Sequence, residues 1–169
     1  MPRIIYSLLG SLILILFAPS LIAAGNISVT KTIAINAPAA EVWGKIKNFN
    51  DLNGWHPAVV KDEIVEGENN KTGAVRLLTL NDGGSIREEL QAWDNAGMTY
   101  SYKILESVLP VSDYESTIKV EPLTDNACRV NWAGSFSASK GKDDKTARDT
   151  ISGIYDAGLE NLVKIMTTE

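Results

Sequence analysis

Residues that hold metals or build nucleophilic triads are scarce in this sequence. Its 169 residues include one histidine, His56, and one cysteine, Cys128. A structural zinc site takes about four nitrogen, sulfur or oxygen ligands, so we expect no metal. A single cysteine forms no intrachain disulfide, and Cys128 is predicted to be a small buried hydrophobe. Any serine nucleophile would need His56 as its base, and no nucleophile motif is present.

Phosphate-binding loops and basic clusters are also missing. Asp82-Gly83-Gly84 has the spacing of a turn and no helix after it, so we predict no cofactor. The chain has 16 Lys and Arg against 21 Asp and Glu, a net charge of −5. Nucleic acids and anionic membrane surfaces bind basic patches, so neither is an expected partner.

Long hydrophobic runs are confined to the N-terminus. Arg3 precedes an apolar run over 4–17, and the small residues Ala23-Ala24-Gly25 follow. This three-part pattern is typical of a secretory signal. The alternative is an uncleaved anchor, but the run is shorter than the ~20 residues that span a bilayer. We therefore expect residues 1–24 to be a cleaved signal peptide, leaving a periplasmic or secreted protein without further membrane contact.

Residues 25–169 are then one domain's worth of chain, large enough to bury a core. At its end, apolar residues recur with the 3.6-residue period of an amphipathic helix over about 143–167. They are Ala147, Ile151, Ile154, Tyr155, Leu159, Leu162, Val163 and Met166. Such a helix is about 36 Å long at 1.5 Å per residue, so its apolar face requires a large partner surface.

Strands supply that surface. Apolar and polar residues alternate over 27–35, which predicts a first strand. Two short helices follow, one after Pro38 with Val42, Trp43 and Ile46 as its apolar stripe and one near 52–55. Six further strands are predicted at 59–66, 74–80, 85–93, 99–106, 113–121 and 129–136. Short turns favour antiparallel neighbours, and a run of strands closed by a helix is typical of an α+β fold.

Several segments carry a resemblance to a known superfamily. They are 37–43, 49–52, 55–59, 88–90, 109–111 with Tyr114, 130–132 with Phe136, and 154–162. The chain resembles the START-like, birch-pollen-allergen-like helix-grip proteins of the SRPBCC superfamily, in the bacterial polyketide cyclase/dehydrase and lipid-transport branch. The signal peptide and Trp55-His56-Pro57 are similar to the small periplasmic MxaD-like proteins that accompany methanol- or alcohol-oxidation systems.

The resemblance implies a seven-stranded antiparallel sheet wrapped around the long C-terminal helix. It also implies a cavity between them that takes an apolar or amphipathic small molecule. Plant hormone receptors of this type place a strand acid and a tyrosine against the ligand. The matching positions here are Glu88 and Tyr114.

Strand parity suggests which side chains face that cavity. Glu88 shares an apolar row with Ile86 and Leu90, so it either meets a cavity or lies exposed near a strand edge. Tyr100 and Tyr102 share a row that suits either a cavity wall or an ordinary core.

In the strand over 74–80, we place Val75, Leu77 and Thr79 on the apolar-facing row and Arg76 outside. On the last helix, Ile154 and Gly158 lie on one face. Glycine inside a helix costs about 1 kcal/mol relative to alanine, so Gly158 indicates close approach, cavity volume or tight packing.

His56 could act as a general acid or base if it faced the cavity, or Trp55-His56-Pro57 could shape the cavity mouth. The predicted ligand-binding residues are Trp55, His56, Val75, Leu77, Glu88, Leu90, Tyr100, Tyr102, Tyr114, Ile154 and Gly158.

Three functions remain open at this point. The first is a periplasmic binding protein for a hydrophobic or amphipathic, lipid-like or polyketide-like molecule. The second is an accessory protein whose acidic surface steers a basic periplasmic redox protein. The third is a cyclase or dehydratase that uses Glu88, Tyr114 or His56.

Overall fold

The computed structural model describes residues 25–168, so the predicted signal peptide lies outside the described residues. The elements in chain order are β1 (Ile27–Ile35), α1 (Ala39–Ile46), the 3-10 turn η1 (Leu52–Gly54), β2 (Val59–Glu66), β3 (Val75–Leu80), β4 (Ser85–Asp94), β5 (Thr99–Ser107), β6 (Val111–Thr124), β7 (Ala127–Ala138) and α2 (Asp144–Thr168). These bounds confirm the α+β prediction, with the second short helix reduced to a single 3-10 turn.

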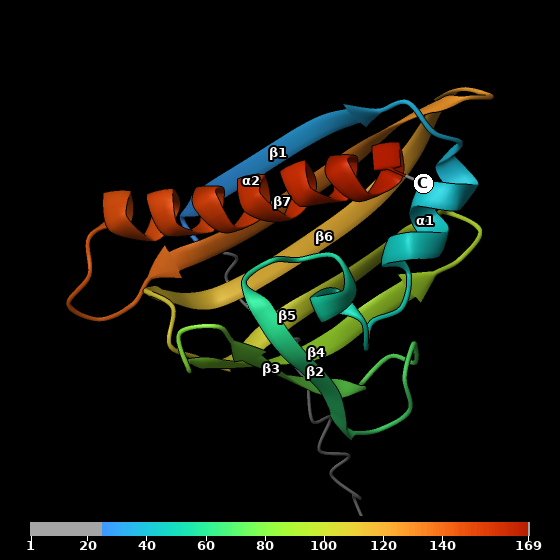
Figure 1. Ribbon diagram of the computed structural model, residues 1–169. Helices are drawn as coiled ribbons and strands as arrows, with labels where there is room; N and C mark the ends of the chain where they lie inside the picture. Colours follow the sequence, from blue (N-terminus) through green and yellow to red (C-terminus); the bar gives the residue numbers. More distant parts are fainter. Residues whose placement is uncertain (1–24, 169) are drawn as a thin grey trace, which may run out of the picture.

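The strands form one antiparallel sheet in the order β1-β7-β6-β5-β4-β3-β2. From β2 to β7, strands that follow one another in the sequence are therefore also adjacent in the sheet, as the short turns predicted. The exception is β1, which crosses over to pair with β7 along its whole length, from Ile27↔Phe136 to Ile35↔Cys128. The sheet curls around α2, which lies across the β1, β7 and β6 half (Figure 1).

α2 has the amphipathic pattern that its sequence predicted. Ala147, Ile151, Tyr155, Leu159 and Leu162 are all buried against the sheet. The helix begins with a side-chain cap, because the Asp143 carboxylate accepts hydrogen bonds from the Thr146 backbone N–H and hydroxyl, each at 2.8 Å. Within residues 25–168, no helix is both long enough and apolar enough to cross a membrane.

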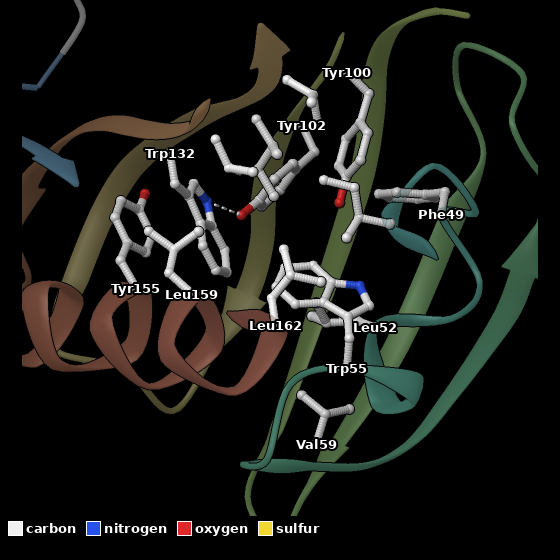
Figure 2. Close-up of a cluster of buried hydrophobic side chains, with 14 of the residues drawn as sticks. Phe49, Leu52, Trp55, Val59, Tyr100, Tyr102, Trp132, Tyr155, Leu159 and Leu162 are labelled. Atoms are coloured by element: carbon white, nitrogen blue, oxygen red, sulfur yellow. Dashed lines mark hydrogen bonds between the residues drawn. The ribbon is translucent and has the colours of Figure 1, made fainter. Parts of the chain in front are cut away.

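The segment after α1 fills one end of the space between helix and sheet. Phe49, Leu52 and Trp55 are buried there, and Figure 2 shows Leu52 and Trp55 beside Leu162 of α2, and Phe49 beside Tyr100 of β5. The Trp55 carbonyl accepts a hydrogen bond from the Asn161 amide at 2.9 Å, which ties this segment to α2. Side chains therefore fill the space between α2 and the sheet at this end of the molecule.

At the opposite end the sheet is less complete. The β5–β6 ladder runs from Thr99↔Lys119 to Lys103↔Glu115, and the pairing does not continue to the segments that flank the connecting loop. Asp113 lies there with φ of 51°, beside a register shift between Ser112 and Glu115. A bulge of this kind bends a strand. The bend lies next to the cavity described below.

Candidate ligand-binding cavity

A cavity of about 250 Å³ lies between α2 and the β3, β4 and β5 part of the sheet. Its apolar walls come from Leu78 and Leu80 of β3, Ile86 of β4, Ile104 of β5, and Ile151 and Ile154 of α2. The β3–β4 turn and the β5–β6 loop also contribute, through Asn81 and Asp82 and through Leu109. Asn81 and Asp82 are exposed, so they mark the mouth.

The closed end is marked by polar and aromatic side chains that are almost fully buried. They are Glu88, Tyr102, Tyr114 and Trp132, with exposed fractions of 2 to 4%. We call these four side chains the floor of the cavity, because they bring most of the buried polar groups of its lining. The cavity therefore has apolar walls and a polar floor. Small-molecule sites commonly combine a mostly apolar lining with a few polar groups that orient the ligand.

Arg76 holds Glu88 in place. Its Nε donates to Glu88 Oε2 at 2.8 Å, and its Nη2 forms an ion pair with the same oxygen at 2.6 Å. Arg76 Nη1 donates to the Phe49 carbonyl at 2.6 Å, and the guanidinium lies 4.1 Å from the centre of the Phe49 ring. Buried charges require partners of this kind, and here β3, β4 and the segment after α1 supply them together.

A second carboxylate faces the same guanidinium. Asp62 Oδ2 lies 3.5 Å from Arg76 Nη1 and accepts the Leu52 N–H at 2.9 Å. Burial raises the pKa of Asp62 to about 6, although the charge of Arg76 and the Leu52 N–H act to lower it, and Glu88 and Asp51 raise it further. Burial also raises the pKa of Glu88, with Arg76 opposing the shift. Arg76 is thus the counter-ion of both Glu88 and Asp62.

Hydroxyl groups form a directed chain beside the cavity. Ser116 donates to the Ala133 carbonyl at 2.9 Å, so its oxygen must accept from Tyr155 at 2.9 Å. The single proton of Trp132 Nε1 is shared between Ser116 at 3.1 Å and the Tyr102 hydroxyl at 3.0 Å. Tyr155 therefore uses its own proton on Ser116 and accepts from Tyr114 at 2.5 Å. The Tyr114 proton is consequently committed to Tyr155.

Tyr102 differs from Tyr114 in this respect. Its hydroxyl oxygen accepts from Trp132 Nε1 at 3.0 Å, as Figure 2 shows. Burial raises its pKa far above the usual value, so the group keeps its proton. Ser116 lies close enough to lower the pKa of Tyr102, but its oxygen already accepts from Tyr155 and Trp132, so within residues 25–168 Tyr102 donates no well-formed hydrogen bond.

His56 lines the cavity as a structural residue. Its Nδ1 accepts the Ala58 N–H at 3.2 Å, so the proton lies on Nε2, which donates to the Ile154 carbonyl at 3.0 Å. Burial lowers the pKa of His56 and keeps the ring neutral. Because both ring nitrogens are engaged, the geometry gives His56 no free nitrogen for acid–base work.

Gly158 explains how His56 comes so close to α2. A Cβ at this position would lie 2.6 Å from His56 Cδ2 and 2.9 Å from Trp132 Cζ3. Close approach is therefore the reason for this glycine. Nothing lies within 4 Å of a Cβ at Gly153, so the same reason does not hold there.

The predicted ligand-binding residues divide into three groups. His56, Glu88, Tyr102, Tyr114 and Ile154 line the cavity. Trp55, Leu90, Tyr100 and Gly158 are buried in the core beside it and do not line it.

The third group, Val75 and Leu77, was wrongly placed. The other row of β3 faces inward: Leu78 lines the cavity and Arg76 is 1% exposed. Leu77 instead lies in a hollow with Arg87 and Val108 on the outer face. The parity was misassigned because a charged residue was expected outside. Glu88 and Asp62, from other strands, make its burial possible.

Sequence reasoning missed three polar contributors to this region, which are Arg76, Asp62 and Ser116. The apolar pair Leu78 and Leu80 shares parity with Arg76, and this pattern was a usable signal for an inward row. Asp62 and Ser116 follow ordinary strand alternation, so the sequence carried no signal that they contribute to this region. Among residues 25–168, no group of three or more His, Cys, Asp or Glu side chains is arranged to hold a metal.

Comparison with known proteins agrees with the geometry. Residues 26–167 match the family described as polyketide cyclase / dehydrase and lipid transport. The chain is 30% identical to the protein XoxI from Bacillus cereus, over 83% of this chain and 95% of that one, with a TM-score of 0.77. It is also 30% identical to an uncharacterised protein from Bacillus thuringiensis, over 83% and 99% of the two chains, with a TM-score of 0.77.

A START superfamily protein from Mycobacterium smegmatis is 12% identical over 83% of this chain and 97% of that one, with a TM-score of 0.70, which shows the shared fold. The order of elements, the helix gripped by the sheet and the match along nearly all of residues 25–168 lead to one conclusion. The chain belongs to the polyketide cyclase / dehydrase and lipid transport family, and it has the fold of the START-like helix-grip proteins.

Proposed function

We propose that this protein binds a small hydrophobic or amphipathic molecule in the cavity between α2 and the sheet, and that it does so after export to the periplasm. The observation that carries the proposal is an apolar cavity of about 250 Å³ whose floor holds a buried carboxylate. A core that served only stability would be filled by side chains, because empty space costs packing energy.

Cavity size limits the ligand. An engineered cavity of about 150 Å³ holds benzene, and sites for drug-sized ligands occupy about 300–1,000 Å³. The present cavity lies between these values, so it suits a single ring or a short branched chain. A long acyl chain or a fused polyketide would require the mouth at Asn81 and Leu109 to open further.

Affinity for an apolar ligand of this size should be modest. Burying about 150–200 Å² of apolar surface at about 25 cal/mol per Å² gives about 4–5 kcal/mol before the entropic cost of binding. Dissociation constants near the millimolar range follow for a purely apolar molecule. Polar contacts at the floor would have to supply any higher affinity.

Blocking the cavity tests the proposal. Ile154→Trp fills the wall from α2, whereas Ile165→Trp makes the same change on the same helix at a half-buried residue that does not line the cavity. We expect p-xylene to shift the NMR signals of cavity-lining residues in the native protein and in the Ile165→Trp variant. The shifts should be lost in Ile154→Trp. Equal binding by both variants would place the ligand elsewhere and reject the proposal.

The accessory role beside a basic periplasmic redox protein stays a prediction. It rests on the excess of acidic residues, 21 against 16 Lys and Arg in the whole chain. A pull-down at low and high salt checks it, because steering by charge weakens as ionic strength rises.

A further inference from the structure

The floor of the cavity carries one hydrogen-bond acceptor and one donor that the protein leaves unused. Arg76 contacts Glu88 through Oε2 alone, by one hydrogen bond and one ion pair, and Oε1 accepts no hydrogen bond from residues 25–168. Tyr102 accepts from Trp132; Ser116 lies close enough to lower the pKa of Tyr102, but its oxygen already accepts from Tyr155 and Trp132, so the Tyr102 proton remains available to a ligand. Both side chains line the cavity and are at most 4% exposed.

These two groups lie on the same face of neighbouring strands, so one small ligand can face both. In the β4–β5 ladder, Glu88 pairs with Ile104 and Leu90 pairs with Tyr102, so Glu88 and Tyr102 are diagonal neighbours on one face of the sheet. The Arg76 guanidinium that bonds Glu88 lies 5.4 Å from the centre of the Tyr102 ring. A buried donor and a buried acceptor on one face match a hydroxyl group, which both donates and accepts.

Charge and hydroxyl direction act against an anion in the same place. Arg76 already faces two carboxylates, Glu88 and Asp62, so an anionic ligand would add a third negative charge to a buried site. Tyr114 lines the floor too, but its proton is committed to Tyr155. An anionic ligand would therefore meet Tyr102 as its one uncommitted donor among these groups.

Resting on the proposed binding function, we propose that the cavity selects neutral, mostly apolar molecules of about one ring that carry a hydroxyl group, and that it rejects carboxylates. The ligand hydroxyl donates to Glu88 Oε1 and accepts from the Tyr102 hydroxyl. The apolar remainder of the ligand lies against Leu78, Ile86 and Ile151. Fatty acids and other anionic amphiphiles are excluded as ligands.

Four probes of one shape test the selectivity in the native protein at neutral pH. They are p-xylene, which lacks a polar group; p-cresol, which donates and accepts; 4-methylanisole, which only accepts; and p-toluate, which is anionic. A hydrogen bond to a charged group corresponds to about tenfold or more in affinity. We expect p-cresol to bind at least about tenfold more tightly than 4-methylanisole, and p-toluate to bind at least about a hundredfold more weakly than p-cresol.

Two conservative variants assign the contacts. Tyr102→Phe removes the donor, so it should weaken p-cresol binding several-fold while p-xylene binding is retained. Tyr100→Phe removes a hydroxyl two residues away on β5 that does not line the cavity, and it should leave all four affinities unchanged. Glu88→Gln keeps Asp62 as the counter-ion of Arg76, and it should reduce the discrimination against p-toluate.

The outcomes separate the two proposals. If p-xylene binds and p-cresol binds no more tightly than p-xylene, the polar floor holds water only. The proposed selectivity for a hydroxyl group is then rejected, while the proposed binding function stands. Binding of p-toluate as tight as that of p-cresol also overturns the selectivity. If none of the four probes binds, both proposals are rejected.

Discussion

A glycine is required at position 158, in the middle of α2, because His56 packs directly against the helix there. The imidazole lies where a methyl group would otherwise be, and it donates to the Ile154 carbonyl one turn earlier. Glycine lowers helix stability on its own, so its presence here reflects a contact with a residue about a hundred positions away in sequence. At the residue scale, α2 carries a glycine that lowers its helix propensity, because the segment after α1 packs against that position.

Alanine substitutions at the two helix glycines should have opposite effects. Gly158→Ala forces the new methyl group against His56 and Trp132, and we expect the free energy of unfolding to fall by about 1 to 3 kcal/mol. Gly153→Ala meets open space and should raise it by about 0.5 to 1 kcal/mol. Urea unfolding of both variants measures the difference. Equal effects at the two positions would contradict the contact with His56.

At the scale of elements, α2 is joined to the sheet by an aromatic stack and by hydroxyl groups. Tyr155 of α2 stacks on Trp132 of β7 with ring centroids 4.4 Å apart, and its hydroxyl reaches Ser116 of β6. Gly134 of β7 leaves room for that hydroxyl, because a Cβ there would lie 2.3 Å from it. Tyr155 therefore joins α2 to both β6 and β7.

A double-mutant cycle tests this junction. Gly134→Ala should destabilise the protein by about 1 to 3 kcal/mol through overpacking. Tyr155→Phe should cost about 1 to 2 kcal/mol through the lost hydrogen bonds. The double variant should cost clearly less than the sum, because Tyr155→Phe removes the hydroxyl that the added methyl group would meet. Additive losses in chemical denaturation would show that the two residues do not share this contact.

At the scale of the whole molecule, buried charge links parts of the fold that are distant in sequence. Arg76 of β3 contacts Asp62 of β2, Glu88 of β4 and the Phe49 carbonyl after α1. With one cation for two carboxylates, the folded state favours uptake of a proton by Asp62, whose pKa is raised to about 6 mainly by burial. A raised pKa in the folded state means stability that is present at low pH and lost as the pH rises through that value.

Asp62→Asn should remove this pH dependence. The native protein should lose about 2 kcal/mol of unfolding free energy relative to Asp62→Asn between about pH 4 and about pH 7, because the unfolded carboxyl already titrates near its ordinary value. Glu63→Gln, which changes an exposed carboxylate on the same strand, is the control. Unfolding curves across this pH range measure the difference. A constant difference between the native protein and Asp62→Asn would contradict the buried charge imbalance.

The sequence by itself determined the α+β class, the long C-terminal helix and the seven strands to within a few residues. These features follow from local periodicity: 3.6 residues along α2 and two residues along each strand. Glu88 was identified in the same way, because an acid on an apolar row indicates a special environment, and the structure buries it at the cavity floor.

Only the tertiary structure decided which face of β3 points inward, because burial of Arg76 depends on Glu88, Asp62 and the Phe49 carbonyl, which alternation within β3 cannot reveal. It also separated Tyr102 from Tyr100, which share parity on β5, since the segment after α1 covers Tyr100 and leaves Tyr102 beside the cavity. Local pattern determines what a segment becomes. Which neighbours share its buried polar groups is a property of the assembled fold.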